Sequence, residues 1–259
     1  MPAVAGSLFI VLPLAAMLTR VDWADFPQLI SSPGARTALL LSLKTSSIAT
    51  GLCLLLGVPM AIVLARITFR GQDVIRSLVL LPLVLPPVVA GIALLYTFGR
   101  RGLLGQTFEA FGIQIAFSTT AVIMAQTFVA MPFLVVSLEG ALRSMGQRYE
   151  AVAATLGARP TTVLRRVTLP MVLPAVASGA VLSFARALGE FGATITFVSN
   201  IPGETQTLPL AIYGLTQSPG GDAAIPRLCA ISVAVSIAAL TGSEWINRRA
   251  RLARKAEAG

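Results

Sequence analysis

A polar segment separates two long apolar stretches of the chain and reads YEAVAATLGARPTTVLRRVTLP from residue 149 to residue 170. Its first part places apolar side chains at Tyr149, Val152, Ala153 and Leu156. Because this is an i, i+3, i+4, i+7 spacing, these side chains share one side of an α-helix. Gly157 follows as a helix stop, so the segment predicts a helix of about two to three turns.

So short a helix needs a surface to pack on, since isolated helices below about 12–15 residues are marginal in water. Two interpretations fit the apolar stripe. It lies on lipid headgroups or on the chain's own membrane domain, or it docks into a socket on a cytosolic partner. The spacing alone leaves both alternatives open.

Composition indicates the class of protein. Of the 259 residues, 55% are hydrophobic and only 12% are charged, whereas a soluble domain averages about 25% charged. Several apolar runs reach the roughly 20 residues that cross about 30 Å of hydrocarbon. The sequence therefore predicts an all-α polytopic membrane protein that forms a single domain over residues 1–259. It contains no His, the commonest metal ligand and general base, and we expect no catalytic residue, metal or cofactor in this chain.

About six transmembrane helices are expected, five plus an extra one at the N-terminus. They cover residues 7–18, 37–65, 74–98, 115–138, 171–198 and 225–246. A cytoplasmic loop over 139–170 and a basic tail over 248–259 complete the chain. The positive-inside rule sets the orientation: thirteen Lys and Arg fall on the side of the Tyr149 helix and five on the opposite side. The distribution of the positive residues, which give a net charge of +9, is thus explained by the orientation in the membrane and does not indicate nucleic-acid binding.

The third and fifth spans carry the unusual residues. Pro86 and Pro87 each remove a helix hydrogen bond, so the third span must kink or open. Broken backbone at membrane depth is tolerated only against protein or a water-filled cavity, which makes this pair a candidate gate or, alternatively, a kinked packing helix. In the fifth span, Arg186 and Glu190 lie one turn apart beside Gly189. They form a structural ion pair or line a translocation pathway, and the sequence leaves both readings open.

The polar segment resembles the EAA loop of ABC importer permeases, a cytoplasmic Glu-Ala-Ala, Gly and Leu-Pro signature. The matching residues are Glu150-Ala151, Ala153-Ala154, Gly157 and Leu169-Pro170. In that family the short helix is the coupling helix, which sits in a cleft of the ATP-binding subunit. Here the acid stands seven residues before the Gly rather than six, so its side chain is expected to point about 100° from the usual direction, and the sequence assigns it no specific role. The resemblance implies coupling to an ATPase through Tyr149, Glu150, Ala151, Val152, Ala153, Leu156 and Gly157.

A second resemblance, to the permease subunit of molybdate ABC importers, covers most of the chain from about residue 42 to 245. The matching stretches are PLVLPPVVAG at 82–91, GRRGLLG at 99–105 and RALGEFGATITFVSNIPGETQTLPLAIY at 186–213. Sulfate permeases are similar but usually continue Tyr-Gly-Ser where this chain has Phe191-Gly192-Ala193. The resemblance implies a type I importer permease fold and a translocation pathway that includes Pro86, Pro87, Arg186, Gly189 and Glu190.

The same resemblance implies the partners. They are a second copy of the chain, two cytosolic ATPase subunits that bind ATP and Mg²⁺, and a periplasmic or lipid-anchored oxyanion-binding protein, all at the inner membrane among its lipids. The chain has no Gly-x-x-x-x-Gly-Lys-[Ser/Thr] loop for ATP. An ion-coupled secondary transporter is a competing class, but the spans hold only one paired ionisable site, Arg186 with Glu190, and no evident inverted repeat.

Overall fold

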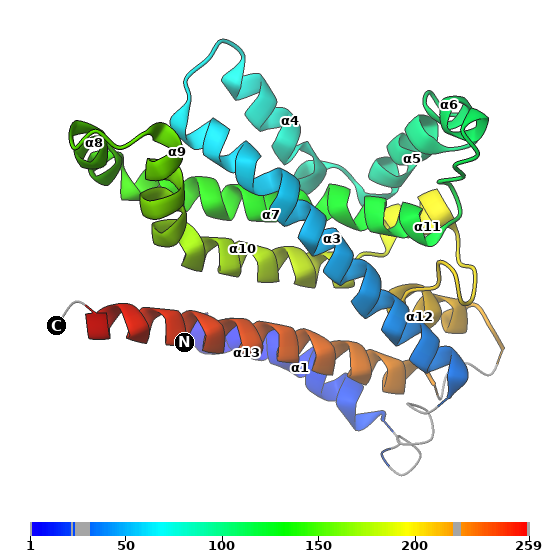
Figure 1. The fold of residues 1–259 in the computed structure, drawn as a ribbon. Coiled ribbons are helices and arrows are strands. Elements are labelled where there is room, and N and C mark those ends of the chain that lie inside the picture. Colours follow the sequence, from blue (N-terminus) through cyan, green and yellow to red (C-terminus); the bar gives the residue numbers. More distant parts are fainter. Residues whose placement is uncertain (1, 22, 24–31, 220–223, 258–259) are drawn as a thin grey trace.

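The computed structural model describes residues 2–21, 23, 32–219 and 224–257, and all the regular elements in these residues are helices (Figure 1). The α-helices are α1 Pro2–Thr19, α3 Pro33–Arg66, α4 Gln72–Val84, α5 Pro87–Phe98, α6 Gly105–Ala110, α7 Thr119–Met145, α8 Arg148–Thr155, α9 Pro160–Val163, α10 Leu169–Leu188, α11 Gly192–Val198, α12 Leu208–Thr216 and α13 Ile225–Glu257. A short π-helix, η1 Leu164–Thr168, joins α9 to α10.

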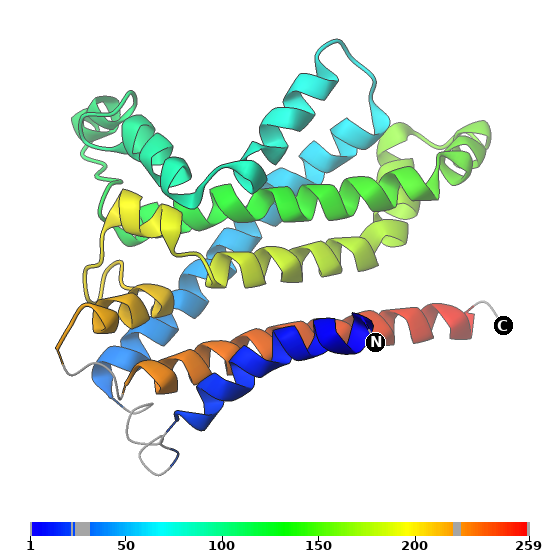
Figure 2. The same cartoon turned by 180° about the vertical axis from the view of Figure 1, so that it is seen from behind.

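Helix α7 lies at the centre of the bundle, packed along α3 on one side and α10 on the other (Figures 1 and 2). Its buried side chains include Val129, Leu134 and Leu138, which form the core with apolar residues of the neighbouring helices. Helix α13 runs beside α10, and α1 lies along α13 with no buried residue of its own. The structure confirms the predicted all-helical membrane fold.

Four helices in the described residues are long and apolar enough to cross a membrane: Pro2–Thr19, Pro33–Arg66, Thr119–Met145 and the continuous run Pro160–Leu188. A fifth span is obtained if α4 and α5 count together. The apolar part of α13, Ile225–Ala239, is shorter. Helix α7 ends and helix α10 begins within residues 139–170, which were predicted to form a loop. Helices α6 and α12 lie in segments between the predicted spans, where the sequence predicted no helix.

The predicted third span is two helices bent by 117° at Leu85 and Pro86. Pro86 and Pro87 lack N–H groups, so the backbone there cannot continue the helical ladder. The direction of the bend is set by α5, which packs closely on α11. A Cβ on Gly91 would lie 2.5 Å from the carbonyl oxygen of Ala193, so only glycine allows the two helices this approach.

The predicted fifth span also ends early, because α10 stops at Leu188 and α11 begins at Gly192. The Glu190 carboxylate accepts a hydrogen bond from the Ala193 N–H at 2.7 Å, which caps the start of α11. The polypeptide therefore turns at the position where a continuous helix was expected.

A buried carboxylate joins α4 to α7 near their ends. Glu139 of α7 accepts hydrogen bonds from Arg76 Nε of α4 at 3.0 Å and from Arg143 Nε at 2.9 Å. The Arg143 side chain also donates to the Leu64 carbonyl of α3 at 3.1 Å. Since α4 has no buried residue, this ion-pair network is a principal attachment of α4 to the bundle.

We predict that Gly91→Ala destabilises the protein, because the added methyl group meets the Ala193 backbone and Thr196 side chain. Overpacking of this kind costs about 1–3 kcal/mol. Gly51→Ala in α3 is the matched control, since a Cβ there meets nothing within 4 Å. The midpoints of thermal unfolding in detergent should fall for the first variant and stay level or rise for the second, and equal midpoints would contradict the close α5–α11 packing.

Glu139→Gln should also lower the unfolding midpoint, because it leaves two guanidinium groups without their shared carboxylate. The side chain of Glu139 is 9% exposed whereas those of Arg76 and Arg143 are 28% and 50% exposed, so we expect a loss of about 1–2 kcal/mol rather than the larger cost of a fully buried pair. Asp73→Asn is the control, since Asp73 pairs with the same Arg76 but is 96% exposed. If Asp73→Asn lowered the unfolding midpoint as much as Glu139→Gln does, burial of the carboxylate would not explain the stability that the ion pair provides.

Candidate functional site

Helix α8 forms where the apolar periodicity predicts it and ends through its glycine. Gly157 adopts φ +82°, and its N–H bonds to the Ala154 carbonyl at 3.0 Å. The next N–H, of Ala158, bonds to the Ala153 carbonyl at 3.1 Å. This pair of bonds is a Schellman motif, which satisfies the last carbonyls of the helix and turns the chain back toward α9.

The apolar stripe of α8 faces outward. Tyr149, Val152 and Leu156 are 57%, 54% and 82% exposed, and Ala151 is exposed beside them. Ala153 is half-buried and turned further toward the bundle. The stripe is therefore not packed on the described residues of the chain's own membrane domain, which removes one of the surfaces that the sequence left open. Large apolar side chains left exposed side by side are typical of a surface that binds something else.

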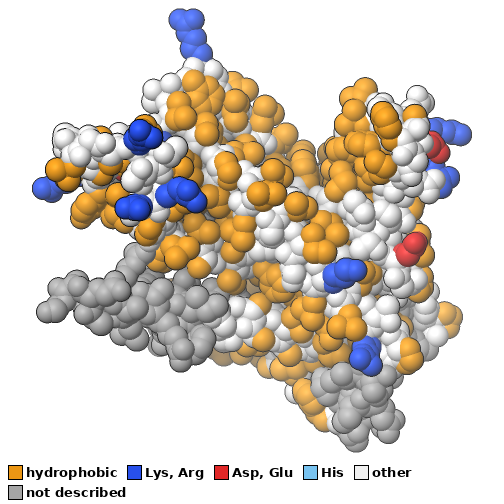
Figure 3. Space-filling model, in the orientation of Figure 1, with side chains coloured by type: hydrophobic (Ala, Val, Ile, Leu, Met, Phe, Trp, Pro, Cys, Tyr) orange, Lys and Arg blue, Asp and Glu red, His pale blue; other side chains and the backbone are white. Residues whose placement is uncertain are grey.

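Lys and Arg side chains gather around α8 and α9 (Figure 3). Arg148, Arg159, Arg165 and Arg166 are all exposed there. This is the end of the bundle that the positive-inside rule places in the cytosol.

The opposite side of α8 carries Glu150, whose carboxylate points into the bundle. The Nε of Arg66, the last residue of α3, lies 3.1 Å from both oxygens of this carboxylate. Thr168 of η1 donates its hydroxyl to the Glu150 Oε1 at 2.7 Å. The one-residue offset in the sequence thus has a structural counterpart: the acid turns inward and binds the chain's own side chains.

Arg66 also holds the end of α7. Its Nη1 donates to the Leu142 carbonyl at 2.8 Å and its Nη2 to the Gly146 carbonyl at 2.9 Å. These carbonyls belong to the negative end of the α7 dipole, where a guanidinium is favoured. The three donors of one side chain thereby join α3, α7 and α8.

An open cavity of about 320 Å³ lies behind α8, between this helix and the ends of α3 and α9. Its wall is mostly apolar and includes Ile62, Ala154, Val163 and Leu164, with Arg66, Glu150 and Thr168 at one side. No residue of α8 is fully buried, and the polar contacts of Glu150 lie in the wall of this open space.

The second group of predicted residues lies away from α8, where two breaks in the helices meet. Pro86 precedes α5 and Pro87 is its first residue, while Gly189 and Glu190 separate α10 from α11. A Cβ on Gly192 would lie 3.5 Å from the Pro87 Cα, so the two breaks pack against each other. The structure brings together residues about a hundred positions apart in the chain, at a point where irregular backbone needs protein or water around it.

Arg186 and Glu190 form the ion pair that their spacing suggested, with Nη1 2.6 Å from Oε2. The Glu190 side chain is 1% exposed, and its other oxygen accepts the Ala193 N–H at the start of α11. The Arg186 side chain is 28% exposed. It is therefore the charged group of this pair that a solute could reach.

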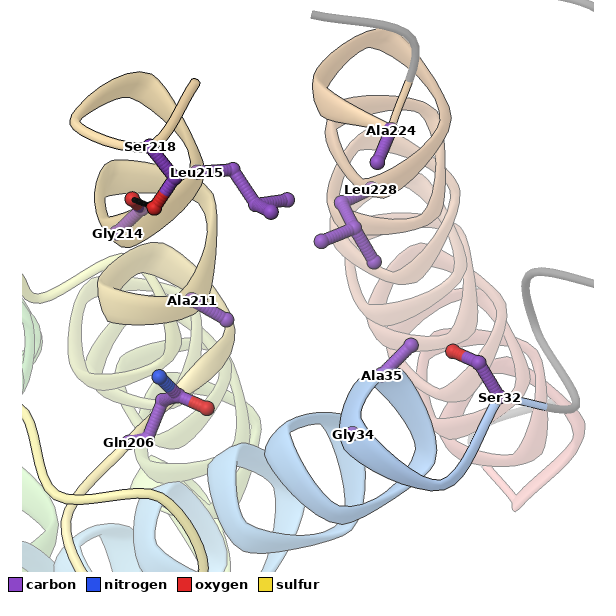
Figure 4. A pocket seen from close by; sticks show the side chains of 10 residues that line it. All are labelled: Ser32, Gly34, Ala35, Gln206, Ala211, Gly214, Leu215, Ser218, Ala224 and Leu228. Carbon is purple, nitrogen blue, oxygen red and sulfur yellow. Dashed lines mark hydrogen bonds between the residues drawn. The ribbon is translucent and has the colours of Figure 1, made fainter. Parts of the chain in front are cut away.

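A further cavity of about 350 Å³ lies at the far end of α3 from Arg66, among α3, α12 and α13 (Figure 4). Leu215 of α12 and Leu228 of α13 point toward each other across it, and Gly34 and Ala35 lie at the start of α3. None of its lining residues is charged. The lining offers no countercharge for an anion, and we assign no site to it.

Sequence reasoning missed Arg66 and Thr168 as members of the site. Arg66 directly follows the apolar run of residues 37–65, and its partner Glu150 lies 84 positions away. Thr168 follows Glu150 by 18 positions in a segment whose π-helical geometry has no periodic signature. The sequence contained one signal of this site. Glu150 stands seven residues before Gly157 rather than six, which predicted a different direction for its side chain.

Comparisons with known proteins agree with this geometry. The family model described as "Binding-protein-dependent transport system inner membrane component" matches residues 55–251. A protein of Mycobacterium tuberculosis, "Molybdenum transport system permease protein ModB", is 58% identical over 240 residues, which are 93% of this chain and 90% of the relative. A protein of Escherichia coli K12 with the same name is 48% identical over 83% of this chain and 94% of the relative.

Among solved structures, a crystal structure of a bacterial ABC transporter involved in the import of alginate superposes with a TM-score of 0.73. The alignment covers 97% of this chain and 93% of that chain at 18% identity, so it concerns the fold alone. The family match and the two relatives cover most of the chain. The chain therefore belongs to the family of binding-protein-dependent transport system inner membrane components.

Proposed function

We propose that this chain is the permease subunit of an ATP-driven importer that carries an oxyanion, molybdate above others, across the inner membrane. The observation that carries the proposal is α8: a short helix at the positively charged end of the bundle, with an apolar stripe that this chain leaves uncovered. The names of the two molybdenum permeases that are 58% and 48% identical to it support the substrate.

The exposed stripe fits a socket on a cytosolic ATPase better than it fits lipid. Tyr149, Val152 and Leu156 form a narrow row only about two turns long. Arginines flank this row on both sides in the sequence, at Arg148 and Arg159. A compact apolar anchor within a polar rim is the usual arrangement of a protein–protein contact. Two of the other coupling residues, Ala151 and Ala153, have small side chains that keep the helix thin enough to enter a groove.

The mechanism is alternating access. ATP and Mg²⁺ bind to two ATPase subunits, and closure of this pair moves the α8 helices of two permease copies. The membrane helices then exchange an inward-open for an outward-open arrangement. Nucleotide shifts this equilibrium only because the contacts at α8 differ between the two states. A periplasmic or lipid-anchored binding protein supplies the selectivity and delivers the anion.

The translocation pathway includes the two packed breaks, at Pro86–Pro87 and at Gly189–Glu190. Irregular backbone at membrane depth is stable beside water or protein, and both are present where two permease copies enclose a pore. Arg186 supplies a partly exposed positive charge next to this point. Because Glu190 already neutralises much of that charge, the anion is held weakly enough to leave.

The proposal is tested by reconstituting the chain in vesicles with its ATPase subunits and binding protein. We expect ATP hydrolysis that rises when the binding protein carries molybdate, and ATP-dependent uptake of molybdate that tungstate inhibits more strongly than sulfate. Vesicles without ATPase subunits are the control. Uptake driven by a proton or sodium gradient in that control would overturn the proposal in favour of a secondary transporter.

We also predict that a cysteine at Leu156 forms a crosslink to the ATPase subunit, because this side chain is 82% exposed at the end of the stripe. A cysteine at Ala158, which is half-buried and lines the cavity behind α8, is the matched control and should react poorly. The crosslinked product is identified by mass spectrometry. Labelling of the Leu156 position by a lipid-soluble probe instead, with no ATPase captured, would place the stripe in the membrane.

A further inference from the structure

We infer that Arg66 is the positioning residue that makes α8 and the membrane helices move as one body, and that its bonds with Glu150 and Thr168 determine how much transport each ATP yields. The inference rests on the proposed function and adds the element that transmits the motion. We refer to these three residues and their mutual bonds as the Arg66 clamp.

The first argument is that the clamp joins α8 to the ends of three longer helical segments. Arg66 belongs to α3, its acceptors Leu142 and Gly146 lie at the end of α7, and Glu150 lies in α8. Through Thr168, the same carboxylate reaches η1 at the start of the long helix that continues into α10. A displacement of α8 is therefore felt at once by the three helices that form the centre of the bundle.

The second argument is that α8 is only partly packed on the rest of the chain. None of its residues is fully buried, and a cavity of about 320 Å³ opens among residues of α8, of α9 and of the end of α3. Side-chain packing, which normally carries motion between helices, is incomplete at this joint. The charge-assisted hydrogen bonds of the clamp lie in the wall of this cavity, and such bonds are about twice as strong as neutral ones.

The third argument is the chemistry of the side chain. Arginine presents donors in a fixed planar fork, so one residue fixes the direction of the Glu150 carboxylate and of two carbonyls together. The side chains of Arg66 and Glu150 are only 12% and 18% exposed, which limits competition from water. The π-helical turn at Thr168 adds a segment of a kind frequently found at functional sites.

The test uses the complete transporter in vesicles and measures molybdate taken up per ATP hydrolysed. For Arg66→Met we expect assembly and ATP hydrolysis to persist while uptake per ATP falls at least about fivefold, the lower end of typical coupling between sites. Thr168→Val is a milder variant that removes one bond, so it should give a smaller fall. The matched controls are Arg70→Met, an exposed arginine in the loop after α3, and Thr162→Val, an exposed threonine before η1.

The double variant Arg66→Met with Glu150→Gln distinguishes a clamp from two separate stabilising contacts. If both residues act through the same contact, uptake per ATP in the double variant should be no lower than in Arg66→Met alone. Additive losses would overturn the inference, as would unchanged uptake per ATP in Arg66→Met. Uptake and hydrolysis that fall in parallel in both Arg66→Met and Thr168→Val would also overturn it, because the clamp would then serve folding or assembly only.

Failure of the proposed function gives a different result. In that case the unaltered complex itself would show no hydrolysis stimulated by the loaded binding protein, whatever the variants do. Stimulated hydrolysis in the unaltered complex together with full coupling in Arg66→Met would leave the permease assignment intact and refute the clamp alone.

Discussion

The arrangement of this protein depends on one constraint: backbone N–H and C=O groups at membrane depth must find partners within the protein. Long continuous helices satisfy it for most of α3 and α7, in which Pro59 and Pro132 each remove one donor of the ladder. Where prolines or a glycine end a helix inside the bundle, the helix ends with unpaired backbone groups pack against each other. Pro87 contacts the start of α11, and the Glu190 carboxylate replaces a missing carbonyl as the acceptor for the Ala193 N–H. The irregular points are thus concentrated in one place.

The same replacement of a missing backbone partner by a side chain occurs at the end of the bundle that carries α8. The last carbonyls of α7 lie beyond the reach of its own N–H groups, and a guanidinium from α3 satisfies the carbonyls of Leu142 and Gly146. A single arginine in this way completes one helix and orients another. The bundle therefore has a well-defined polar joint on the side where the exposed stripe of α8 is presented.

Features governed by local chemistry could be predicted from the sequence. The spacing of Tyr149, Val152 and Leu156 gave helix α8 and its stripe, Gly157 gave its end, and the paired prolines gave a break. Features governed by distant contacts could not. The 117° bend is set by Gly91 against α11, and the partner of Glu150 is remote in the chain. Helix α12 was missed because glycines and prolines on both sides of LPLAIYGLT resemble a loop.

Helix α3 has a consequence of its own, because it is anchored at both ends. Near its start the buried Ser42 hydroxyl accepts the Leu208 N–H of α12 at 2.7 Å, and its last residue is Arg66. With 34 residues the helix is about 51 Å long. A rigid rod of that length, pivoted near its middle and tilted by about 5°, carries its two tips some 2 Å in opposite directions. A tilt of α3 therefore displaces its two ends together, and no series of intermediate contacts is needed to relate the two faces of the bundle.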